Sequence, residues 1–362
     1  MSVVREKFRC DVFDAWLTLS MELYRDQRFV IRNFSVDDVD AYWAIRNDPS
    51  VAEFQSWSLP YPVEKSKEHI ARFIELAKFT DGESFGYVIA DPVIDVMLGD
   101  IVVILGWAGR SAEIGYSLTP EARGRGIATD AVRHIIRHLF DVVEVRRIHA
   151  SLHPDNVASM MLLERLGFVY EGTARQSHWV DDVCTDDPHF GLLRSDWDAW
   201  NARMPSRPSL VEIQPLTNLN RDDVFRIEPH RSQLRFISPM ANSAAHALAP
   251  DLDDDGGRIV PWPRVVVADG IVVGFVMVAD QTVTFPHPML WRLLIDRTHQ
   301  RRGIGWKVLD LLADHFRAAG CSQLLVSWVP GRGSPEPMYL RYGFIPTGEV
   351  DGDEVVSSLS LQ

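Results

Sequence analysis

The sequence has little of several features that would assign it to a specialised class. Its 362 residues include only three cysteines, Cys10, Cys184 and Cys321, too few and too scattered for a disulfide framework or a thiolate metal site. No apolar run reaches the roughly 18 residues of a membrane span. Lysine is rare, and acidic residues exceed basic ones, 50 to 37, for a net charge of −13. We therefore expect a cytoplasmic protein with no membrane or nucleic-acid partner, because phosphate backbones require a basic surface.

The length predicts two domains, since one domain takes about 150 residues. Segment 204–209, with two prolines and two serines, separates two patterned regions and is the expected linker. Residues 1–22 are expected to form a partly helical extension, because acidic residues interrupt their apolar stretch and no small-residue cleavage site follows. The expected domains are residues 23–203 and 210–362.

A divergent internal repeat supports this division. Arg123-Gly-Arg-Gly-Ile-Ala128 is echoed by Gln300-Arg-Arg-Gly-Ile-Gly305, and each copy is followed by a Gly-Phe pair. The distance from the start of the motif to the glycine of that pair is 44 residues in the first half and 43 in the second. The nearly equal spacing of two shared features indicates a tandem duplication.

Each half reads as a mixed sheet with helices packed on it, an α/β fold. Apolar residues recur with helical period after each glycine motif. They are Ala131, Val132, Ile135, Ile136, Leu139 and Phe140 in the first half, and Val308, Leu309, Leu312 and Phe316 in the second. Strand-like runs occur at 29–34, 85–90, 97–105, 112–118 and 148–152, and again at 211–215, 264–268, 272–278, 290–295 and 324–329.

The glycine motifs join a strand to a helix, where backbone N–H groups and the helix dipole favour an anion. The nucleotide P-loop pattern does not occur in the sequence. The dinucleotide fingerprint fails at its third small residue, which is Thr129 in one half and Val308 in the other. The pattern Gln/Arg-x-x-Gly-x-Gly/Ala is matched twice. A tight strand–helix turn without a ligand is the alternative, which two equally spaced copies disfavour.

On this pattern the sequence resembles the GNAT superfamily of acetyl-CoA-dependent N-acetyltransferases. The resemblance implies two tandem GNAT domains, each with a mixed, mostly antiparallel sheet flanked by helices, and a loop that grips the pyrophosphate of coenzyme A. The implied coenzyme-binding residues are Leu118, Arg123, Gly124, Arg125, Gly126, Ile127, Ala128 and Asn156 in the first half, and Ile295, Gln300, Arg301, Arg302, Gly303, Ile304 and Gly305 in the second.

Residues 28–200 resemble the ribosomal-protein alanine N-acetyltransferases, through Glu113-Ile-Gly-Tyr116, Asn156-Val-Ala-Ser159 and Leu166-Gly-Phe168. The resemblance implies that Asn156 contacts the pantetheine arm and that Ser159 is the general acid. Glu113 is a candidate base. The structural alternatives are a helix-start residue for Ser159 and a strand-end carboxylate for Glu113.

Residues 211–362 resemble the bacterial diamine and spermidine acetyltransferases, through Trp291-Arg-Leu-Leu-Ile-Asp296 and Tyr339-Leu-Arg-Tyr-Gly-Phe344. Tyr339 falls where that superfamily places its general acid, although it can also be a core aromatic. Leu163 stands at the corresponding place in the first half. Leu290 replaces Glu113, so the base of the second half would be ordered water or another acid, with Glu336, Glu349 and Glu354 as candidates.

Acetyl transfer requires a neutral amine and a proton for the thiolate that leaves. An amine of pKa about 10.4 is neutral in only about one molecule in 2,500 at pH 7, which adds roughly 4.6 kcal/mol to the barrier unless a base helps. The thioester oxyanion requires a backbone N–H, which the resemblance places near Ser117–Leu118 and Leu294–Ile295.

No metal site is expected. His134 and His138 lie one helical turn apart, a spacing that suits zinc, but they share a polar face with Arg133 and Arg137 and lack a third ligand. A solvated face is the better interpretation.

The sequence thus predicts transfer of acetyl from acetyl-CoA to a primary amine, namely a polyamine, a small amine or a peptide N-terminus. One alternative is an aminoglycoside acetyltransferase. Another is a single catalytic half joined to a non-catalytic acyl-CoA-binding scaffold. The assembly would be a monomer or a homodimer.

Overall fold

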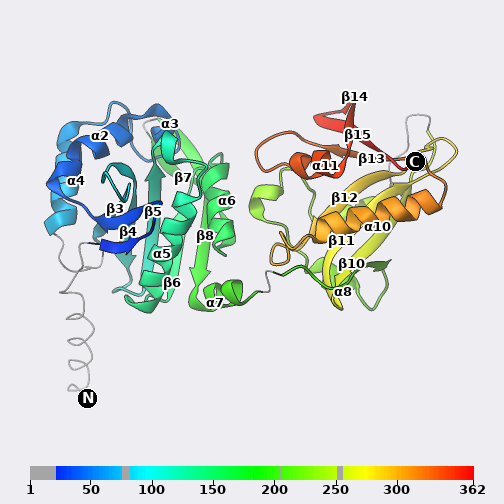
Figure 1. Cartoon of the computed structure of the whole chain (residues 1–362), viewed down its shortest axis with the longest axis horizontal. Coiled ribbons are helices and arrows are strands. Elements are labelled where there is room, and N and C mark those ends of the chain that lie inside the picture. The colour runs from blue at the N-terminus through cyan, green and yellow to red at the C-terminus, as the bar shows by residue number, and fades with distance from the viewer. Residues whose placement is uncertain (1–21, 76–81, 181, 204–205, 251–255) are drawn as a thin grey trace, which may run out of the picture. The chain divides into compact units, whose positions relative to one another are not determined.

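The computed structural model describes residues 22–75, 82–180, 182–203, 206–250 and 256–362. The chain divides between Ala202 and Arg203 into two compact units, called unit 1 and unit 2 below (Figure 1). The expected N-terminal extension lies outside the described residues except for Glu22, and so do residues 204–205 of the expected linker.

Unit 1 is built on one eight-stranded sheet in the order β1-β2-β3-β4-β5-β6-β8-β7. All neighbours in it are antiparallel except β5 and β6. The strands are β1 (Glu22–Arg25), β2 (Val30–Asn33), β3 (Ser84–Ala90), β4 (Met97–Gly106), β5 (Ser111–Leu118), β6 (Arg147–Ser151), β7 (Val169–Val180) and β8 (Val183–Leu193). The helices are α2 (Val39–Asn47), α3 (Pro49–Ala52), α4 (Val63–Glu75), α5 (Ile127–Asp141), α6 (Val157–Arg165) and α7 (Arg194–Ala202), with short 3-10 turns at Val36–Asp38 and Pro120–Ala122.

Helices cover both faces of this sheet because the strands alternate apolar residues between two cores. Ile101 and Val103 of β4 pack in one cluster with the apolar stripe of α5 and with Leu163 of α6. Val88 of β3 packs in a second cluster with α2 and α4. The expected apolar face of α5 is confirmed, since all six of its residues are buried.

Unit 2 repeats this plan with a seven-stranded sheet in the order β14-β15-β13-β12-β11-β10-β9. Its single parallel pair is β12 with β13. The strands are β9 (Val211–Pro215), β10 (Val260–Ala268), β11 (Ile271–Asp280), β12 (Met289–Ile295), β13 (Gln323–Trp328), β14 (Ile345–Asp351) and β15 (Glu354–Ser360). The helices are α8 (Arg221–Phe225), α9 (Met240–Leu248), α10 (Ile304–Ala318) and α11 (Glu336–Tyr342), with a 3-10 turn at Arg231–Gln233.

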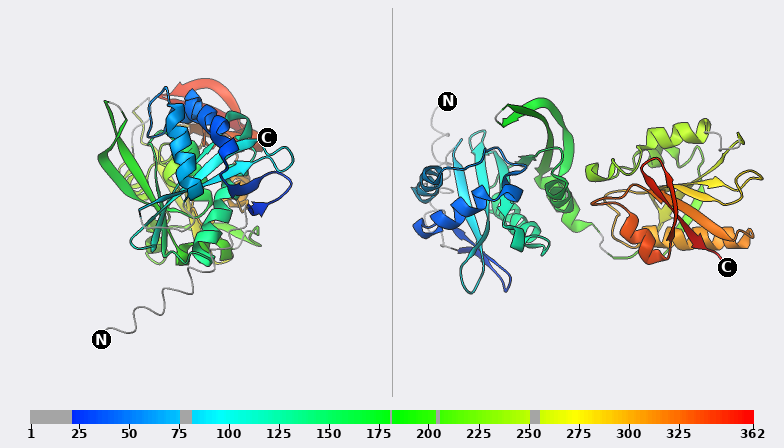
Figure 2. Two further views of the ribbon diagram at one scale, coloured as in Figure 1. Left: turned by 90° about the vertical axis from the view of Figure 1, so that its left-hand side faces the viewer. Right: turned by 90° about the horizontal axis from the view of Figure 1, so that it is seen from above.

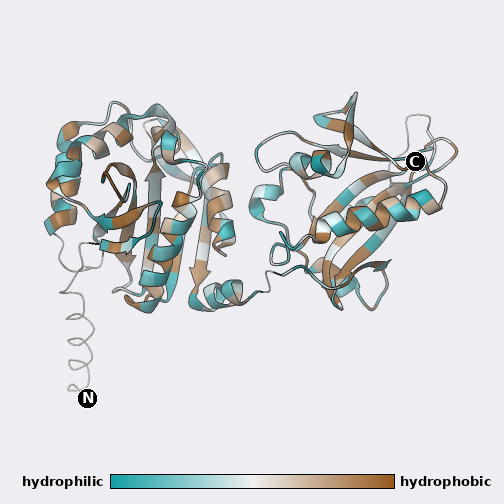
Figure 3. Cartoon of the chain, viewed as in Figure 1, coloured by the Kyte–Doolittle hydropathy of each residue, from teal (hydrophilic) through white to brown (hydrophobic). Residues whose placement is uncertain are grey.

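Two separate cores also flank the sheet of unit 2. One contains the stripe of α10 with Val326 and Tyr339, and the other contains Met240 of α9 with Val265 and Leu294. In the right-hand view of Figure 2, α9 and α10 lie on opposite sides of the strands. Apolar and polar residues alternate along α5 and α10 in Figure 3, as their burial requires. The fold class expected from the sequence is therefore confirmed.

The face expected to be solvated is only partly so, since His134 and His138 are half-buried whereas Arg137 is exposed. The ring of His134 stacks on Tyr24, with 3.5 Å between centroids, and burial lowers the pKa of both histidines. Tyr24 of the N-terminal strand thus covers His134, which the helical period alone does not reveal. Within the described ranges there is no cluster of three potential metal ligands, and no helix is long and apolar enough to cross a membrane.

Candidate active sites

The parallel strands of each unit pair only at one end and then separate. In unit 1 the ladder between β5 and β6 ends at Glu113 and His149, although β5 continues to Leu118. In unit 2 the ladder between β12 and β13 ends at Leu290 and Val326. A register shift between β11 and β12 follows immediately and leaves Trp291 without a partner in that ladder. Each sheet therefore opens into a V-shaped gap that points toward the glycine motif.

The two glycine motifs adopt one backbone conformation. Gly126 and Gly303 are the N-caps of α5 and α10, with φ of 78° and 79°. Two residues earlier, Gly124 has φ of 75° and Arg301 has φ of 61°. The left-handed region favours glycine, so the second motif holds an arginine in a conformation that its Cβ disfavours. The same turn is thus built from different residues.

These turns present a row of unused hydrogen-bond donors. No backbone N–H of residues 124–128 or 301–305 donates to another group in the described part of the chain. Half of these residues are exposed, whereas Ile127 and Ile304 are buried, and each turn lies at the positive end of a 15-residue helix. Such a row of N–H groups is a cradle for a phosphate or pyrophosphate.

The first side chain of each motif makes a hydrogen bond to the last residue of the preceding strand. Arg123 donates to the carbonyl oxygen of Leu118 at 3.3 Å, and Gln300 donates to that of Ile295 at 2.9 Å. Arg123 also bonds Ser50, and Gln300 pairs with Gln233. These two side chains hold the turn in place.

The later arginines of the motifs differ in their surroundings. Arg125 is exposed and makes no hydrogen bond or ion pair within the described ranges. Arg302 donates to the carbonyl oxygen of Ser206 at 2.9 Å. Arg207, the next residue of that segment, lies 3.4 Å from the position that a Cβ on Gly303 would occupy. Unit 2 therefore adds a linker arginine to its glycine turn.

The last residue of each splayed strand directs its N–H into the gap. The N–H of Thr119 donates to Leu98, and that of Asp296 donates to Val273, both on the neighbouring antiparallel side. Because N–H directions alternate along a strand, those of Leu118 and Ile295 point the opposite way. They lie where a thioester oxyanion or an amide carbonyl would need a donor.

Glu113 lies at the fork of unit 1, beside a histidine. The register pairs it with His149, so both side chains project from the same face, opposite the core under α5. Burial lowers the pKa of His149, whereas the charge of Glu113 opposes that shift. The arrangement supplies two neighbouring proton acceptors beside the gap.

Ser159 lies on the other flank of the same gap, in the first turn of α6. Its Oγ is 2.8 Å from the hydroxyl of Tyr116, which comes from the splayed part of β5, and burial raises the pKa of Tyr116. The Asn156 side chain caps the helix by accepting the N–H of Ser159 at 3.0 Å. A hydroxyl pair therefore spans the fork, and the Asn156 carbonyl is already engaged.

Tyr339 occupies the corresponding part of unit 2. Its ring stacks on Trp328 with 5.5 Å between centroids, and only 6% of the residue is exposed. Burial first, and then the charge of Glu354, raise the pKa of Tyr339. Of the three candidate bases, Glu354 is therefore close enough to act on this hydroxyl electrostatically. Glu349 lies in the exposed strand β14, and Glu336 begins α11.

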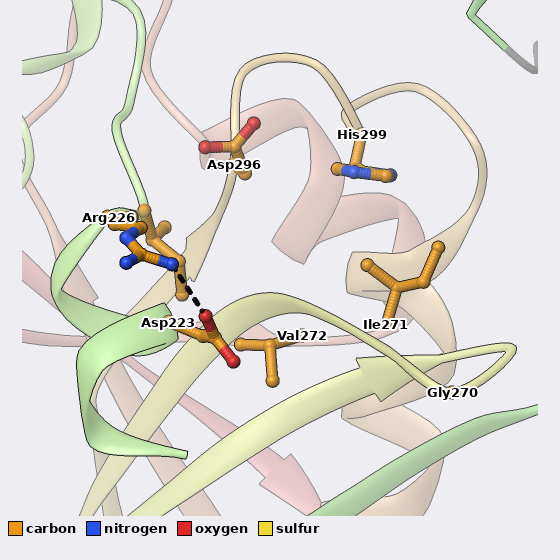
Figure 4. Close-up of a pocket in the computed structure, with 8 residues that line it drawn as sticks. Asp223, Arg226, Gly270, Ile271, Val272, Asp296 and His299 are labelled. Carbon is orange, nitrogen blue, oxygen red and sulfur yellow. Dashed lines mark hydrogen bonds and ion pairs between the residues drawn. The ribbon is translucent and has the colours of Figure 1, made fainter.

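A pocket borders the turn of unit 2 without containing its predicted residues. It is lined by Asp223 of α8, Arg226 just after that helix, the β10–β11 hairpin, Asp296 and His299, as Figure 4 shows. Asp296 accepts hydrogen bonds from Thr298 and from the N–H of Glu228, and Arg226 pairs with Asp223. The charged side chains of this pocket are therefore already engaged within unit 2.

Comparison with known proteins identifies the family. Residues 28–169 match the family described as Acetyltransferase (GNAT) domain, and residues 217–344 match Acetyltransferase (GNAT) family. The probable N-acetyltransferase YjcK of Bacillus subtilis (strain 168) is 32% identical over 138 residues, which cover 38% of this chain and 75% of that protein. The chain belongs to the GNAT acetyltransferase family. It is a tandem N-acetyltransferase, as the sequence predicted.

Other GNAT proteins are similar over part of the chain. The [Ribosomal protein uS5]-alanine N-acetyltransferase of Escherichia coli (strain K12) is 28% identical over 118 residues, 32% of this chain and 61% of that one. The crystal structure of ribosomal-protein-S5-alanine acetyltransferase from Vibrio fischeri is 24% identical, covering 49% of this chain and 99% of that one with a TM-score of 0.44.

Sequence reasoning missed several side chains that the GNAT fold brings to the two forks. His149 is a lone histidine in a strand, and its pairing with Glu113 depends on the register. Tyr116 was within the quoted motif, but its partner Ser159 is 43 residues away. Arg207 belongs to the linker and reaches the turn only through the fold. None of these contacts has a local sequence signal.

Proposed function

We propose that each unit binds acetyl-CoA at its glycine turn and transfers the acetyl group to a primary amine. The amine approaches from the face of the sheet opposite α5 in unit 1 and opposite α10 in unit 2. One observation carries this proposal. In both units the unused N–H groups of the turn lie at the open end of a splayed parallel pair. A long ligand with a pyrophosphate at one end can therefore place its other end in the fork.

In unit 2, Tyr339 is the proposed general acid. Burial keeps its hydroxyl protonated at neutral pH, so it can donate a proton to the coenzyme A sulfur as the C–S bond breaks. The N–H of Ile295 is the proposed donor to the thioester oxygen. Glu354, which holds a short hydrogen bond from Ser327, is the proposed acceptor of the proton lost by the amine.

In unit 1, Glu113 and His149 are the proposed proton acceptors, and Ser159 is the proposed donor. Tyr116 orients the hydroxyl of Ser159 and can reprotonate it after the transfer. An α-amine, with pKa about 7.7–8.0, requires less help from a base than a lysine-like amine does. The name of the relative from Escherichia coli, an alanine N-acetyltransferase of a ribosomal protein, supports a peptide N-terminus as the acceptor here.

In a second candidate function, unit 1 is a non-catalytic scaffold that binds coenzyme A. Leu163, fully buried, fills the place that Tyr339 has in unit 2, so unit 1 lacks the tyrosine hydroxyl in its second helix. The Tyr116–Ser159 pair argues for catalysis in unit 1, because it restores a hydroxyl to the fork.

Calorimetric titration of acetyl-CoA tests the proposal. We expect a stoichiometry near two, falling to one in Gly126→Glu and in Gly303→Glu, because a carboxylate there repels a pyrophosphate. Gly109→Glu and Gly320→Glu are matched controls, since both glycines have positive φ and open surroundings but begin no helix. A stoichiometry of two in either turn variant would overturn the assignment of that turn. Acetyl transfer to a panel of amines, measured with each variant, then shows which unit catalyses the reaction.

A further inference from the structure

An arginine without a carboxylate partner lies in the splayed part of β12. Arg292 lies two residues after Leu290, which is the last residue of β12 in the parallel ladder. Leu293 and Ile295 pack in the core under α10, so Arg292 projects from the opposite face with Leu294. Its Nη2 lies 3.4 Å from Nδ1 of His246 in α9, which covers that face. This is the face from which the proposed amine approaches.

The guanidinium of Arg292 is only partly satisfied. Nη1 donates to the neighbouring carbonyl of Trp291 at 2.7 Å, and Nε is buried with no hydrogen-bond partner. No carboxylate of the described residues lies within ion-pair distance of it. Burial lowers the pKa of Arg292, and the charge of Glu354 opposes this without making contact.

A second partly buried arginine of the same sheet shows how such a group is normally accommodated. Arg264 of β10 lies over the ring of Trp262, 3.8 Å from its centroid, and donates to Pro263 at 2.8 Å. Its cation is balanced by an aromatic face. Arg292 makes no comparable contact within the described residues, so its charge is left for a ligand.

The missing partner has a definite chemistry. A partly buried guanidinium without an anion is unfavourable, and a carboxylate matches its planar fork with two parallel hydrogen bonds. Arg292 precedes Ile295 by three residues, about 10 Å along a strand, which its own side chain and a small amino acid together can span. A polyamine would instead bring a second cation to this face.

Unit 1 has no equivalent. The residue at the same place relative to the glycine turn is Gly115, and no atom lies within 4 Å of the position that a Cβ on it would occupy. This face of the unit 1 sheet carries Glu113 and His149 instead of an arginine. The two units therefore share a coenzyme turn but present opposite charges to the acceptor.

We propose that unit 2 acetylates an amine that also carries a carboxylate, an amino-acid-like acceptor whose carboxylate is bound by Arg292. The inference rests on the proposed function, in which unit 2 transfers acetyl to an amine. It narrows the acceptor class and disfavours simple diamines and polyamines as substrates of this unit.

The test uses pairs of amines that differ by the α-carboxylate. They are L-lysine and cadaverine, L-ornithine and putrescine, and L-phenylalanine and 2-phenylethylamine. Turnover is measured in the full chain carrying Gly126→Glu, so that unit 2 supplies the activity. We expect kcat/KM to favour the carboxylated member of at least one pair about 10- to 100-fold, the ratio that one charged hydrogen-bonded pair supplies. Arg292→Gln should reduce this ratio to near one, mainly through KM.

Arg264→Gln is the matched control and should keep the ratio. Preference for the diamines, or an unchanged ratio in Arg292→Gln, would overturn the inference while leaving acetyl transfer intact. If unit 2 acetylates none of these amines, the proposed acetyl transfer by unit 2 is refuted. The inference about a carboxylate site at Arg292 is then tested by ligand binding alone. L-Lysine and N-acetyl-L-lysine would then be titrated into the protein with coenzyme A. Binding that Arg292→Gln abolishes would support a carboxylate site, and no binding would refute it.

Discussion

Individual residues distinguish the chemistry of two units that share one plan. Leu163 and Tyr339 occupy equivalent places in their second helices, and both are buried. The hydroxyl at the fork comes from Tyr339 in unit 2 but from Ser159, one turn earlier, in unit 1, where Tyr116 holds it. The proposed proton donors therefore occupy different turns of equivalent helices, and their variants should behave differently.

Tyr339→Phe should lower kcat of unit 2 by about 10²- to 10⁴-fold, the usual contribution of a positioned general acid. Coenzyme A binding should not change, because the ring keeps its stacking on Trp328. Tyr342→Phe is the control from the same helix, since its hydroxyl bonds Asp310 outside the fork. Steady-state kinetics with parallel calorimetry measures both effects. Unchanged kcat in Tyr339→Phe would remove this tyrosine from the mechanism.

His230 should make the stability of unit 2 depend on pH. Burial, assisted by the charges of Arg297 and Arg301, lowers its pKa to about 4. The unfolded histidine binds a proton near pH 6.5, so between these values the unfolded state holds more protons and stability rises with pH. The contribution is complete above pH 6.5 and is lost as the pH falls toward 4. We expect a loss of about 2 kcal/mol between pH 7 and pH 5.

Denaturant unfolding at the two pH values measures this loss, followed in the transition assigned to unit 2. His230→Asn should flatten that part of the profile, because asparagine does not titrate. His315→Asn is a control in the same unit, stacked on Trp262 at a site distant in sequence. An equal pH dependence in wild type and His230→Asn would contradict the assignment.

At the scale of elements, the strand–turn–helix proposed to hold the coenzyme is fixed by backbone conformation more than by residue identity. Gly124 and Arg301 adopt similar left-handed φ values. For an arginine this costs free energy, of order 1 kcal/mol. Arg301 is followed directly by Arg302, and its charge adds to the positive field at the turn.

Arg301→Gly should therefore stabilise unit 2 by about 0.5–1 kcal/mol and weaken acetyl-CoA binding at the same time. Gly124→Ala should destabilise unit 1 by a similar amount, since a Cβ meets no atom within 4 Å there and only φ opposes it. Chemical unfolding and calorimetry report the two quantities separately. Destabilisation by Arg301→Gly would show that the arginine side chain contributes more to the turn than its backbone strain removes.

Helix α2 is joined to strand β4 by a buried ion pair. Arg46 and Asp100 make two hydrogen bonds, of 2.9 and 2.6 Å, and Arg46 lies between the rings of Tyr42 and Trp57. Asp100→Ala should cost about 3–5 kcal/mol, because it leaves a buried cation without its partner. Asp141→Ala, which breaks an exposed pair with Arg194, should cost at most about 1 kcal/mol. Similar losses in the two variants would contradict the role of burial.

The sequence predicted those elements whose pattern matches their burial. The strands before each turn and the stripes of α5 and α10 follow a clear period, and they were predicted close to their observed bounds. Five strands were not predicted, namely β1, β7, β8, β14 and β15, and two of them show why. β8 contains Asp186, Asp187 and Pro188, and every residue of β14 is exposed. Their pairing, not their own pattern, makes them strands.

The candidate site was predictable to the same extent. The glycine turns have a local signal, because positive φ and a helix start constrain residues that are adjacent in sequence. The contacts of Arg123 with Ser50 and of His149 with Glu113 join residues far apart in the chain. Such contacts depend on register and on helix placement, which the residue pattern of one element does not determine.

On the scale of the whole molecule, the two units are self-contained. Each hydrophobic cluster draws its residues from one unit alone. The linker is nevertheless part of unit 2, because Ser206 accepts from Arg302 and Arg207 lies over Gly303. The functional boundary thus falls at Arg203, seven residues before the domain start expected from the sequence.

Dividing the chain at this boundary tests that conclusion. Fragments 22–202 and 203–362 should each fold and bind one acetyl-CoA, because neither loses a core contact to the other. A shorter fragment, 210–362, should fold but bind acetyl-CoA about 3- to 10-fold more weakly, since it lacks the Ser206 contact and the charge of Arg207. The double variant Arg207→Gln with Ser206→Gly in fragment 203–362 should reproduce only part of that loss in affinity. It removes the charge of Arg207 but keeps the backbone carbonyl at position 206 that accepts from Arg302. Equal affinities of fragments 203–362 and 210–362 would show that the linker contributes nothing to the coenzyme site, and the turn would then act through its own residues.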